Sequence, residues 1–227
     1  MYFFFDPTYI LVIIGAVISL IASINVNRSF NKYAKVANSR GLKAEDVAAQ
    51  ILRTAGINDV RIERVSGNLS DHYSPKEKVL RLSDSVYGKT SVAAIGVAAH
   101  ECGHAIQHQV GYKPLALRSV SVPLANIGSY LSWPLLIIGI IFGFSKLAFA
   151  GVILFSFVVA FQLITLPVEF NASSRAIEIL DSNYILVDEE LAGAKKVLKA
   201  AALTYVAALL TAVLQLLRLV LIARRSD

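Results

Sequence analysis

Two histidines and a glutamate within five residues form the segment of this sequence whose side chains are best suited to chemistry. The segment HECGH occupies residues 100–104, so His100 and His104 are four positions apart. On a helix this spacing places both imidazoles on one face, about one turn apart, as two ligands of one zinc ion require. Glu101, rotated by roughly 100° around the axis, is placed to take a proton from an attacking water and pass it to a leaving amine. The spacing therefore predicts a hydrolytic zinc centre.

A catalytic zinc takes three protein ligands and keeps one position open, so two histidines leave the set incomplete. The candidates for the third ligand are His72, His108, Glu169 and Glu178. His108 follows His104 by one further turn, and its drift around the axis makes three ligands from one straight helix awkward. Glu169 comes just after Pro167, at the start of a predicted helix whose positive end its carboxylate also suits. The alternative interpretation of the motif is a group of solvated or hydrogen-bonded polar residues on an ordinary helix.

The elements that must position these residues are those of a membrane protein. Of the 227 residues, 56% are hydrophobic and only 17% are charged, which lies outside the usual range of soluble proteins. Crossing a bilayer takes about 20 apolar residues, and the segments near residues 9–26, 120–144, 147–167 and 200–223 meet that need. The predicted fold is mainly α, a multi-pass membrane helical bundle with a small α+β metalloprotease module beside the membrane.

Positive charge in this chain is interpreted as a topology signal. The net charge is +6, and since Lys and Arg accumulate on the cytoplasmic side of membrane proteins, we expect no nucleic-acid partner. The first apolar segment is followed at once by Arg28, Lys32, Lys35, Arg40 and Lys43. This places the next segment in the cytoplasm and the amino terminus outside. Arg218 interrupts the last apolar segment, and three alternatives follow: it faces the bundle, it reaches toward an interface, or this helix does not fully cross the membrane. Basic residues on both sides of this segment leave its orientation open: Lys195, Lys196 and Lys199 before it, Arg224 and Arg225 after it.

A polar module between the membrane segments carries the motif. Its sequence predicts a helix near residues 44–54 closed by Gly56, a strand at VRIERV, and a hairpin in which NLSDHYS and KVLRLSD flank a turn at residues 74–77. Thr90 or Ser91 is expected to cap the motif helix. Polar residues on both sides make this helix too short to cross the membrane, so an intramembrane site is not expected.

We divide the chain into five predicted parts. They are an anchor at 1–27, a cytoplasmic module at 28–118, a transmembrane hairpin at 119–167 closed by Pro167, a helix at 168–187 that carries two of the candidates for the third ligand, and a membrane helix at 188–227 that begins with Asp188 as its cap.

The motifs resemble a known family. HECGH together with EFNASSRA at residues 169–176 resembles the integral-membrane zinc metalloproteases of the gluzincin type, which include the heat-shock membrane protease and the CAAX prenyl endopeptidase. Nearly the whole chain is similar to the YugP-like neutral zinc metallopeptidases of bacterial membranes, through DHYSPKEKVLRLSD, SVAAIGVAAHECGHAIQ and LAGAKKVLKAAALTYVAA. The resemblance implies one zinc ion per chain held by His100, His104 and Glu169, with Glu101 as the general base, and it argues against His108.

One position departs from the broader gluzincin pattern. Relatives read ExxxD on the third-ligand helix, where the aspartate braces a ligand histidine, but here Ser173 stands in its place. A hydroxyl can still hydrogen-bond, although it supplies no charge to orient an imidazole. Further candidates for contact with the ligands or with a developing oxyanion are His72, Tyr73, Asn171 and Arg175. Cys102 projects away from the ligand face and is expected to serve packing only.

The predicted function is that of an integral membrane zinc endopeptidase. By the resemblance, it lies in the bacterial inner (plasma) membrane with its active site facing the cytoplasm, and its substrates are peptides or proteins, membrane proteins among them. An extended substrate would add to the edge of the predicted hairpin. The first alternative is a catalytically silent membrane scaffold that retains zinc, which would have no need of a general base at Glu101. The second is a transporter, which would need more polar residues along its spans than this sequence has.

Overall fold

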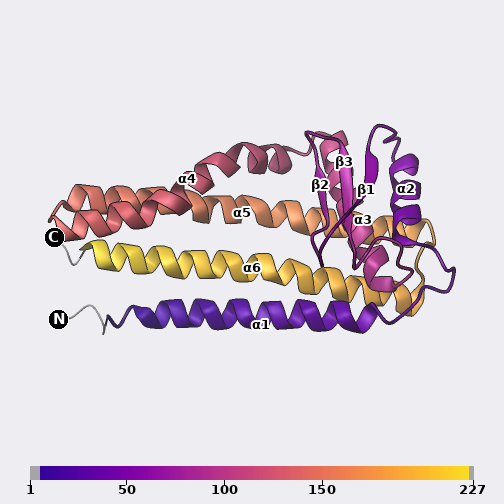
Figure 1. Ribbon diagram of the computed structural model, residues 1–227, viewed down its shortest axis with the longest axis horizontal. Coiled ribbons are helices and arrows are strands. Elements are labelled where there is room, and N and C mark those ends of the chain that lie inside the picture. The colour runs from indigo at the N-terminus through magenta and orange to yellow at the C-terminus, as the bar shows by residue number, and fades with distance from the viewer. Residues whose placement is uncertain (1–5, 225–227) are drawn as a thin grey trace. The chain divides into compact units, whose positions relative to one another are not determined.

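The computed structural model describes residues 6–224, which form six helices and three strands (Figure 1). In chain order these are α1 (Tyr9–Tyr33), α2 (Ala44–Thr54), β1 (Arg61–Val65), β2 (His72–Ser74), β3 (Val79–Ser83), α3 (Val92–Gln109), α4 (Lys113–Ile141), α5 (Ser145–Ser182) and α6 (Asp188–Arg224). The chain forms two compact units: a bundle unit of residues 1–23, 116–167 and 204–227, and a sheet unit of residues 24–115 and 168–203. The predicted fold class is confirmed, because long helices dominate and the small sheet is accompanied by helices α2 and α3.

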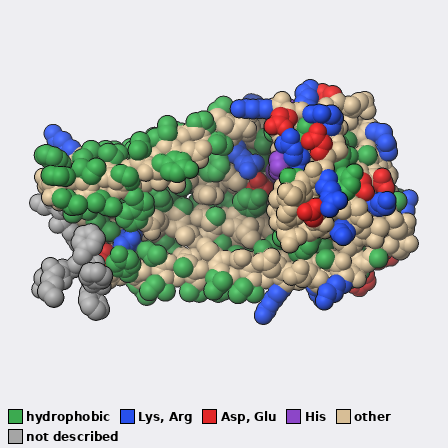
Figure 2. Space-filling model, viewed as in Figure 1, with side chains coloured by type: hydrophobic (Ala, Val, Ile, Leu, Met, Phe, Trp, Pro, Cys, Tyr) green, Lys and Arg blue, Asp and Glu red, His purple; other side chains and the backbone are tan. Residues whose placement is uncertain are grey.

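The four long helices α1, α4, α5 and α6 contain the four predicted apolar segments. Each is long and apolar enough to cross a membrane, with mean hydropathy of 2.4, 1.7, 2.5 and 2.3 in its most apolar part. Large apolar side chains such as Ile13, Ile21, Ile141 and Ile153 stay more than half exposed. Figure 2 shows hydrophobic side chains spread over these helices in the bundle unit, whereas charged side chains gather over the strands of the sheet unit. A surface of this kind is suited to lipid.

The prediction that Pro167 closes the membrane hairpin is wrong. Helix α5 continues through Pro167 without interruption, and α4 likewise contains Pro123 and Pro134. Proline removes one backbone donor, but membrane helices tolerate this where neighbouring groups satisfy the freed carbonyl. As a result, Glu169 lies on the same continuous helix as the apolar segment that precedes it.

Arg218 faces the interior of the bundle unit, which was one of the predicted alternatives. Its side chain is only 7% exposed. The guanidinium carbon lies 4.3 Å from the ring centroid of Tyr9 and 5.5 Å from that of Trp133. These aromatic faces accommodate the charge by cation–π attraction. Arg225, which was also considered in the predicted topology, lies outside the described residues, as do residues 1–5 and 226–227.

The sheet unit is built around three short strands in the order β1-β3-β2. Strand β2 pairs antiparallel with β3, which confirms the predicted hairpin, and β1 pairs parallel with β3. One face of the sheet carries the fully buried Leu80 and contributes to the core of the unit. Helix α3 packs against β2 and β3, while α2 packs against α3 and β1. The motif helix is therefore the central element of this unit.

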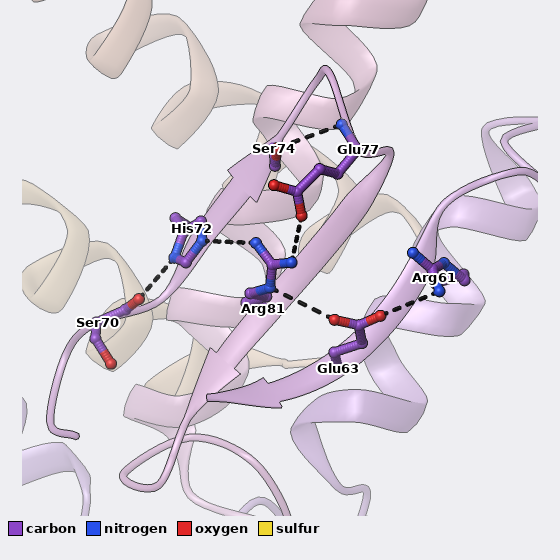
Figure 3. A network of polar contacts seen from close by, with 7 residues as sticks. All are labelled: Arg61, Glu63, Ser70, His72, Ser74, Glu77 and Arg81. Atoms are coloured by element: carbon purple, nitrogen blue, oxygen red, sulfur yellow. Dashed lines mark hydrogen bonds and ion pairs between the residues drawn. The ribbon is translucent and has the colours of Figure 1, made fainter. Parts of the chain in front are cut away.

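The other face of the sheet carries a polar network, drawn in Figure 3. Arg81 of β3 stands opposite Glu63 of β1 and His72 of β2 in the strand register. Its guanidinium pairs with Glu63 at 3.5 Å and with Glu77, and lies 3.5 Å from His72 Nε2. Because side chains alternate along a strand, this row of polar groups points away from the face that carries Leu80.

The motif helix α3 begins where the sequence predicts. The Ser91 hydroxyl accepts a hydrogen bond from the Ala94 N–H at 3.3 Å, so of the two predicted caps it is Ser91 that acts. At the end of α2, Gly56 has φ +72, as expected of a closing glycine. Fourteen of the 18 residues of α3 are buried, from Val92 to Gln107. A helix enclosed in this way holds its side chains in fixed directions.

Candidate metal centre

Three potential metal ligands converge from two helices of the sheet unit. His100 and His104 come from α3 and Glu169 from α5, and one donor atom of each lies within 4.8 Å of the others. Glu169 Oε2 is 3.3 Å from His100 Nε2 and 3.5 Å from His104 Nε2. Two ligand atoms of a tetrahedral zinc site are separated by about 3.4 Å when each is at its usual distance from the metal. The donor set and both separations fit a zinc ion.

The direction of the His104 ring is set by Gln107, one turn further along α3. The Gln107 side-chain N–H group donates to the Val168 carbonyl at 2.8 Å, so its oxygen must be the atom that faces His104 Nδ1 at 3.0 Å. That oxygen can only accept, and His104 Nδ1 therefore carries the proton. The lone pair is left on Nε2, which is the atom that faces Glu169.

His100 is held in a similar way by Ser173, one turn after Glu169 on α5. The Ser173 hydroxyl lies 3.1 Å from His100 Nδ1. With this nitrogen engaged, His100 presents Nε2 to Glu169, and its ring stands nearly perpendicular to that of His104, with centroids 4.8 Å apart. Both imidazoles are thus oriented by neutral groups rather than by a carboxylate.

Asn171 and Arg175 act on His104 indirectly, through Gln107. Asn171 Oδ1 accepts hydrogen bonds from Gln107 Nε2 at 3.0 Å and from Arg175 Nε at 2.8 Å. The sequence singled out Asn171 and Arg175 as polar candidates but missed Gln107, through which they act. The available signal was an amide three residues after His104, within an otherwise small and apolar helix segment.

Glu101 and Cys102 occupy different surroundings. Glu101 is 8% exposed, and its carboxylate makes no hydrogen bond or ion pair with any of the described residues, so it is available to a substrate or a water. The Cys102 thiol is fully buried and lies 3.6 Å from the Ala48 carbonyl. Burial raises the pKa of this thiol, which makes it inert. Its placement agrees with the predicted packing role.

The remaining candidates for ligands lie elsewhere. His72 is on the polar face of the sheet, where its Nδ1 is 2.9 Å from the Ser70 carbonyl (Figure 3). The next residue, Tyr73, points to the opposite face, and its hydroxyl lies 2.9 Å from Nδ1 of His108. Glu178 lines a separate surface groove between α5 and α6. Only Glu169, of the four residues considered, joins His100 and His104 in the described chain.

The electrostatics of the site favour a cation. Burial opposes the charged form of His104, but the hydrogen bond that its protonated Nε2 donates to the Glu169 carboxylate and the charge of Glu101 outweigh it, and the pKa of His104 is raised. A proton therefore occupies this imidazole more readily than usual. A metal ion bound there would supply the same positive charge and displace the proton.

Close contact between α3 and α5 depends on Gly103, and its replacement should disrupt the site. A Cβ atom at Gly103 would lie 2.5 Å from the Ala172 carbonyl oxygen, so the two helices would have to separate. We expect Gly103→Ala to lower stability by about 1–3 kcal/mol and to reduce zinc content. Gly96→Ala on the same helix is the matched control, because its Cβ would meet Ala194 Cβ at an ordinary 3.4 Å. Thermal unfolding in detergent and zinc analysis check both variants, and equal behaviour of the two would contradict the prediction.

Gln107 is expected to contribute to metal affinity without touching the metal. Gln107→Leu removes the acceptor that fixes the proton on His104 Nδ1, and it leaves the Val168 carbonyl without this donor. Loss of such an outer partner typically lowers metal affinity about 10–100-fold. Competition with a chromophoric zinc chelator measures the change. Gln109→Leu, an exposed site on the same helix, should leave the affinity unchanged; the prediction fails if both variants weaken zinc binding alike.

Together the long apolar helices and the converging set of two imidazoles and a carboxylate define a membrane protein with a candidate zinc centre. Comparison with known proteins places it further. Residues 8–224 match the model of the family described as "Putative neutral zinc metallopeptidase", and the chain belongs to this family. It is 48% identical over 205 residues to "Putative membrane protease YugP" of Bacillus subtilis (strain 168), covering 90% of this chain and 91% of the relative. No solved structure matches the chain. The family resemblance predicted from the sequence is confirmed.

Proposed function

We propose that this protein is an integral membrane zinc endopeptidase of the gluzincin type, which hydrolyses peptide bonds at a cytoplasmic site beside the membrane. The observation that carries the proposal is the pair of distances, 3.3 and 3.5 Å, from Glu169 Oε2 to the two histidine Nε2 atoms. A structural zinc site would normally close all four positions with protein ligands, whereas the described chain offers three. Membership of a zinc peptidase family agrees with the proposal.

His100, His104 and Glu169 would hold one zinc ion, and Glu101 would perform the proton transfers. A bound zinc ion supplies Lewis acidity, which polarises a carbonyl group and makes water a better nucleophile. Glu101 takes a proton from the attacking water while the water oxygen bonds to the carbonyl carbon. The same carboxyl then gives that proton to the amide nitrogen as the carbon–nitrogen bond breaks. The products are a carboxylic acid and an amine, and Glu101 returns to its starting state.

Strand β2 is the element we propose for substrate binding. It lies at the edge of the sheet and packs against α3, the helix that carries the motif. An extended peptide could pair with its free edge through backbone hydrogen bonds, which hold a substrate without demanding a particular sequence. The basic residues after the apolar part of α1 support a cytoplasmic position for this unit. Peptides or membrane proteins that present an extended segment there are the proposed substrates.

The test is cleavage of an unfolded reporter by the full chain, purified in detergent and loaded with zinc. We expect cleavage that stops on treatment with 1,10-phenanthroline and returns when zinc is added back. Zinc content measured on the same samples shows whether the metal is present. A chain that binds zinc but cleaves neither unfolded nor membrane-embedded substrates would be a silent scaffold, and the proposed activity would be wrong.

A further inference from the structure

A second candidate site lies in the sheet unit, away from the predicted metal ligands. It is a cavity of about 560 Å³ between the last turns of α1, the loop between β1 and β2, and the segment that leads into α3. Polar side chains from all three segments line it: Asn31, Lys35, Asn68, Ser85, Lys89 and Thr90. Nothing in the proposed peptidase mechanism uses these residues.

The charged groups that line this cavity are both cationic. Lys35 and Lys89 contribute to the lining, and no aspartate or glutamate does. Neither ammonium group forms an ion pair with a described residue. The nearby Asp84 is already engaged, since it accepts hydrogen bonds from the Gly67 N–H at 3.0 Å and from Arg64 Nε at 2.7 Å. Asp84 also attracts Lys89 at longer range, but its carboxylate does not line the cavity, so the lining itself carries a net positive charge.

Neutral donors accompany the two lysines. The side chains of Asn31, Asn68 and Thr90 make no hydrogen bond to other described residues, so their polar hydrogens are free for a ligand. Two ammonium groups combined with amide and hydroxyl donors match the needs of a phosphate group, which has several oxygens that only accept.

An apolar group stands beside these donors. Leu69 lines the cavity and is 41% exposed. Its φ of +53 is uncommon for a residue other than glycine, and its N–H donates to the Ser85 hydroxyl at 3.2 Å, which holds the loop in place. The cavity therefore offers an anion site next to an apolar surface, as an amphiphilic ligand requires.

The cavity also lies at the end of a predicted membrane span. Asn27 and Asn31 of its lining occupy one face of α1 at the helical spacing i, i+4, and Ala34, the residue that follows the end of α1, also lines the cavity. In the sequence they are interleaved with Arg28, Lys32 and Lys35, the first basic residues after the apolar part of α1. Such residues belong at the level of the lipid headgroups on the cytoplasmic side, where anionic lipids are concentrated.

We propose that this cavity binds the phosphate group of an anionic phospholipid. Lys35 and Lys89 neutralise the phosphate, the asparagine and threonine side chains donate to its oxygens, and Leu69 contacts the glycerol and the first acyl carbons. A soluble phosphate ester would satisfy the lysines equally well but would make no use of Leu69. A comparison of the two kinds of ligand therefore distinguishes the sources.

The test is isothermal titration calorimetry on the full chain in a neutral detergent. Dihexanoyl phosphatidylglycerol, kept below its critical micelle concentration, is compared with dihexanoyl phosphatidylcholine, glycerol 3-phosphate and inorganic phosphate. We expect saturable binding of phosphatidylglycerol, at least about tenfold tighter than that of the other three. The double variant Lys35→Gln/Lys89→Gln should lose about tenfold or more in affinity. Lys32→Gln/Lys43→Gln removes the same charge from outside the cavity and should change the affinity by less than about twofold.

A third variant separates the effect of the cavity from the effect of its positive charge on lipid binding. Ala34 is exposed and lines the cavity, so Ala34→Phe fills it without altering the net charge, and we expect a loss of affinity similar to that of Lys35→Gln/Lys89→Gln.

Unchanged thermal unfolding and zinc content show that each variant is folded. Equal losses in the two lysine pairs, or full binding by Ala34→Phe, would show diffuse surface attraction and overturn the proposal. Equal binding of glycerol 3-phosphate and phosphatidylglycerol would overturn the assignment to a lipid. The test needs no peptidase activity, so its outcome is independent of the proposed function.

Discussion

Glu101→Gln is expected to abolish peptide hydrolysis while leaving the zinc content unchanged. The substitution keeps the size of the side chain but removes the group that accepts a proton from the attacking water. General base catalysis of this kind typically contributes about 10²–10⁴-fold to the rate. Because Glu101 is not one of the three converging ligands, the metal should stay bound. The measurement is the initial rate of reporter cleavage, with zinc determined on the same preparation.

The conservative variant Glu101→Asp sharpens this test. It retains a carboxylate but shortens the side chain by one methylene, so it should recover part of the activity lost in Glu101→Gln. A carboxylate at this position can accept a proton from water and an amide cannot, so a purely structural role for Glu101 would not produce this order of activities. If Glu101→Gln cleaves as fast as the unaltered chain, Glu101 is not the base. If it loses zinc as well, the carboxylate has a structural function at the site.

The elements that could be predicted from the sequence are those whose signal is local. The helical spacing of His100 and His104, the cap at Ser91 and the turn between β2 and β3 all depend on residues a few positions apart. Pro167 misled the prediction because the local rule, that proline ends a helix, is relaxed in apolar helices whose surroundings satisfy the freed groups.

The parts of the site that were missed depend on contacts between distant segments. Gln107 orients His104 only because α5 brings the Val168 carbonyl within 2.8 Å of its amide. The sequence also did not show which of two neighbouring residues, His72 or Tyr73, faces α3. Strand alternation makes them point to opposite faces, and the choice follows from the burial of Leu80, the cross-strand partner of Tyr73. Register of this kind is set by the packing of the whole unit.

Glu169→Gln is expected to remove zinc from the protein, and with it the activity. The carboxylate of Glu169 is 2% exposed and supplies one of the three converging donors. Together with Glu101 it also provides two negative charges that balance the two positive charges of a zinc ion in a buried site. An amide keeps the shape but removes the charge and is a much poorer zinc donor. Affinity should therefore fall by more than the about 10–100-fold typical of an outer partner.

Glu178→Gln is the matched control for this prediction, since it makes the same change on the same helix at a residue outside the converging set. Thermal unfolding measured at increasing zinc concentrations distinguishes Glu169→Gln from Glu178→Gln. A ligand that binds only the folded state raises the stability of that state as the ligand concentration increases. The unaltered chain and Glu178→Gln should become more stable on addition of zinc, and Glu169→Gln should not. If Glu169→Gln instead binds zinc normally while His108→Phe loses it, the third ligand is His108. The hydrogen bond between His108 and Tyr73 would then have to break for the metal to bind, which the present geometry gives no reason to expect.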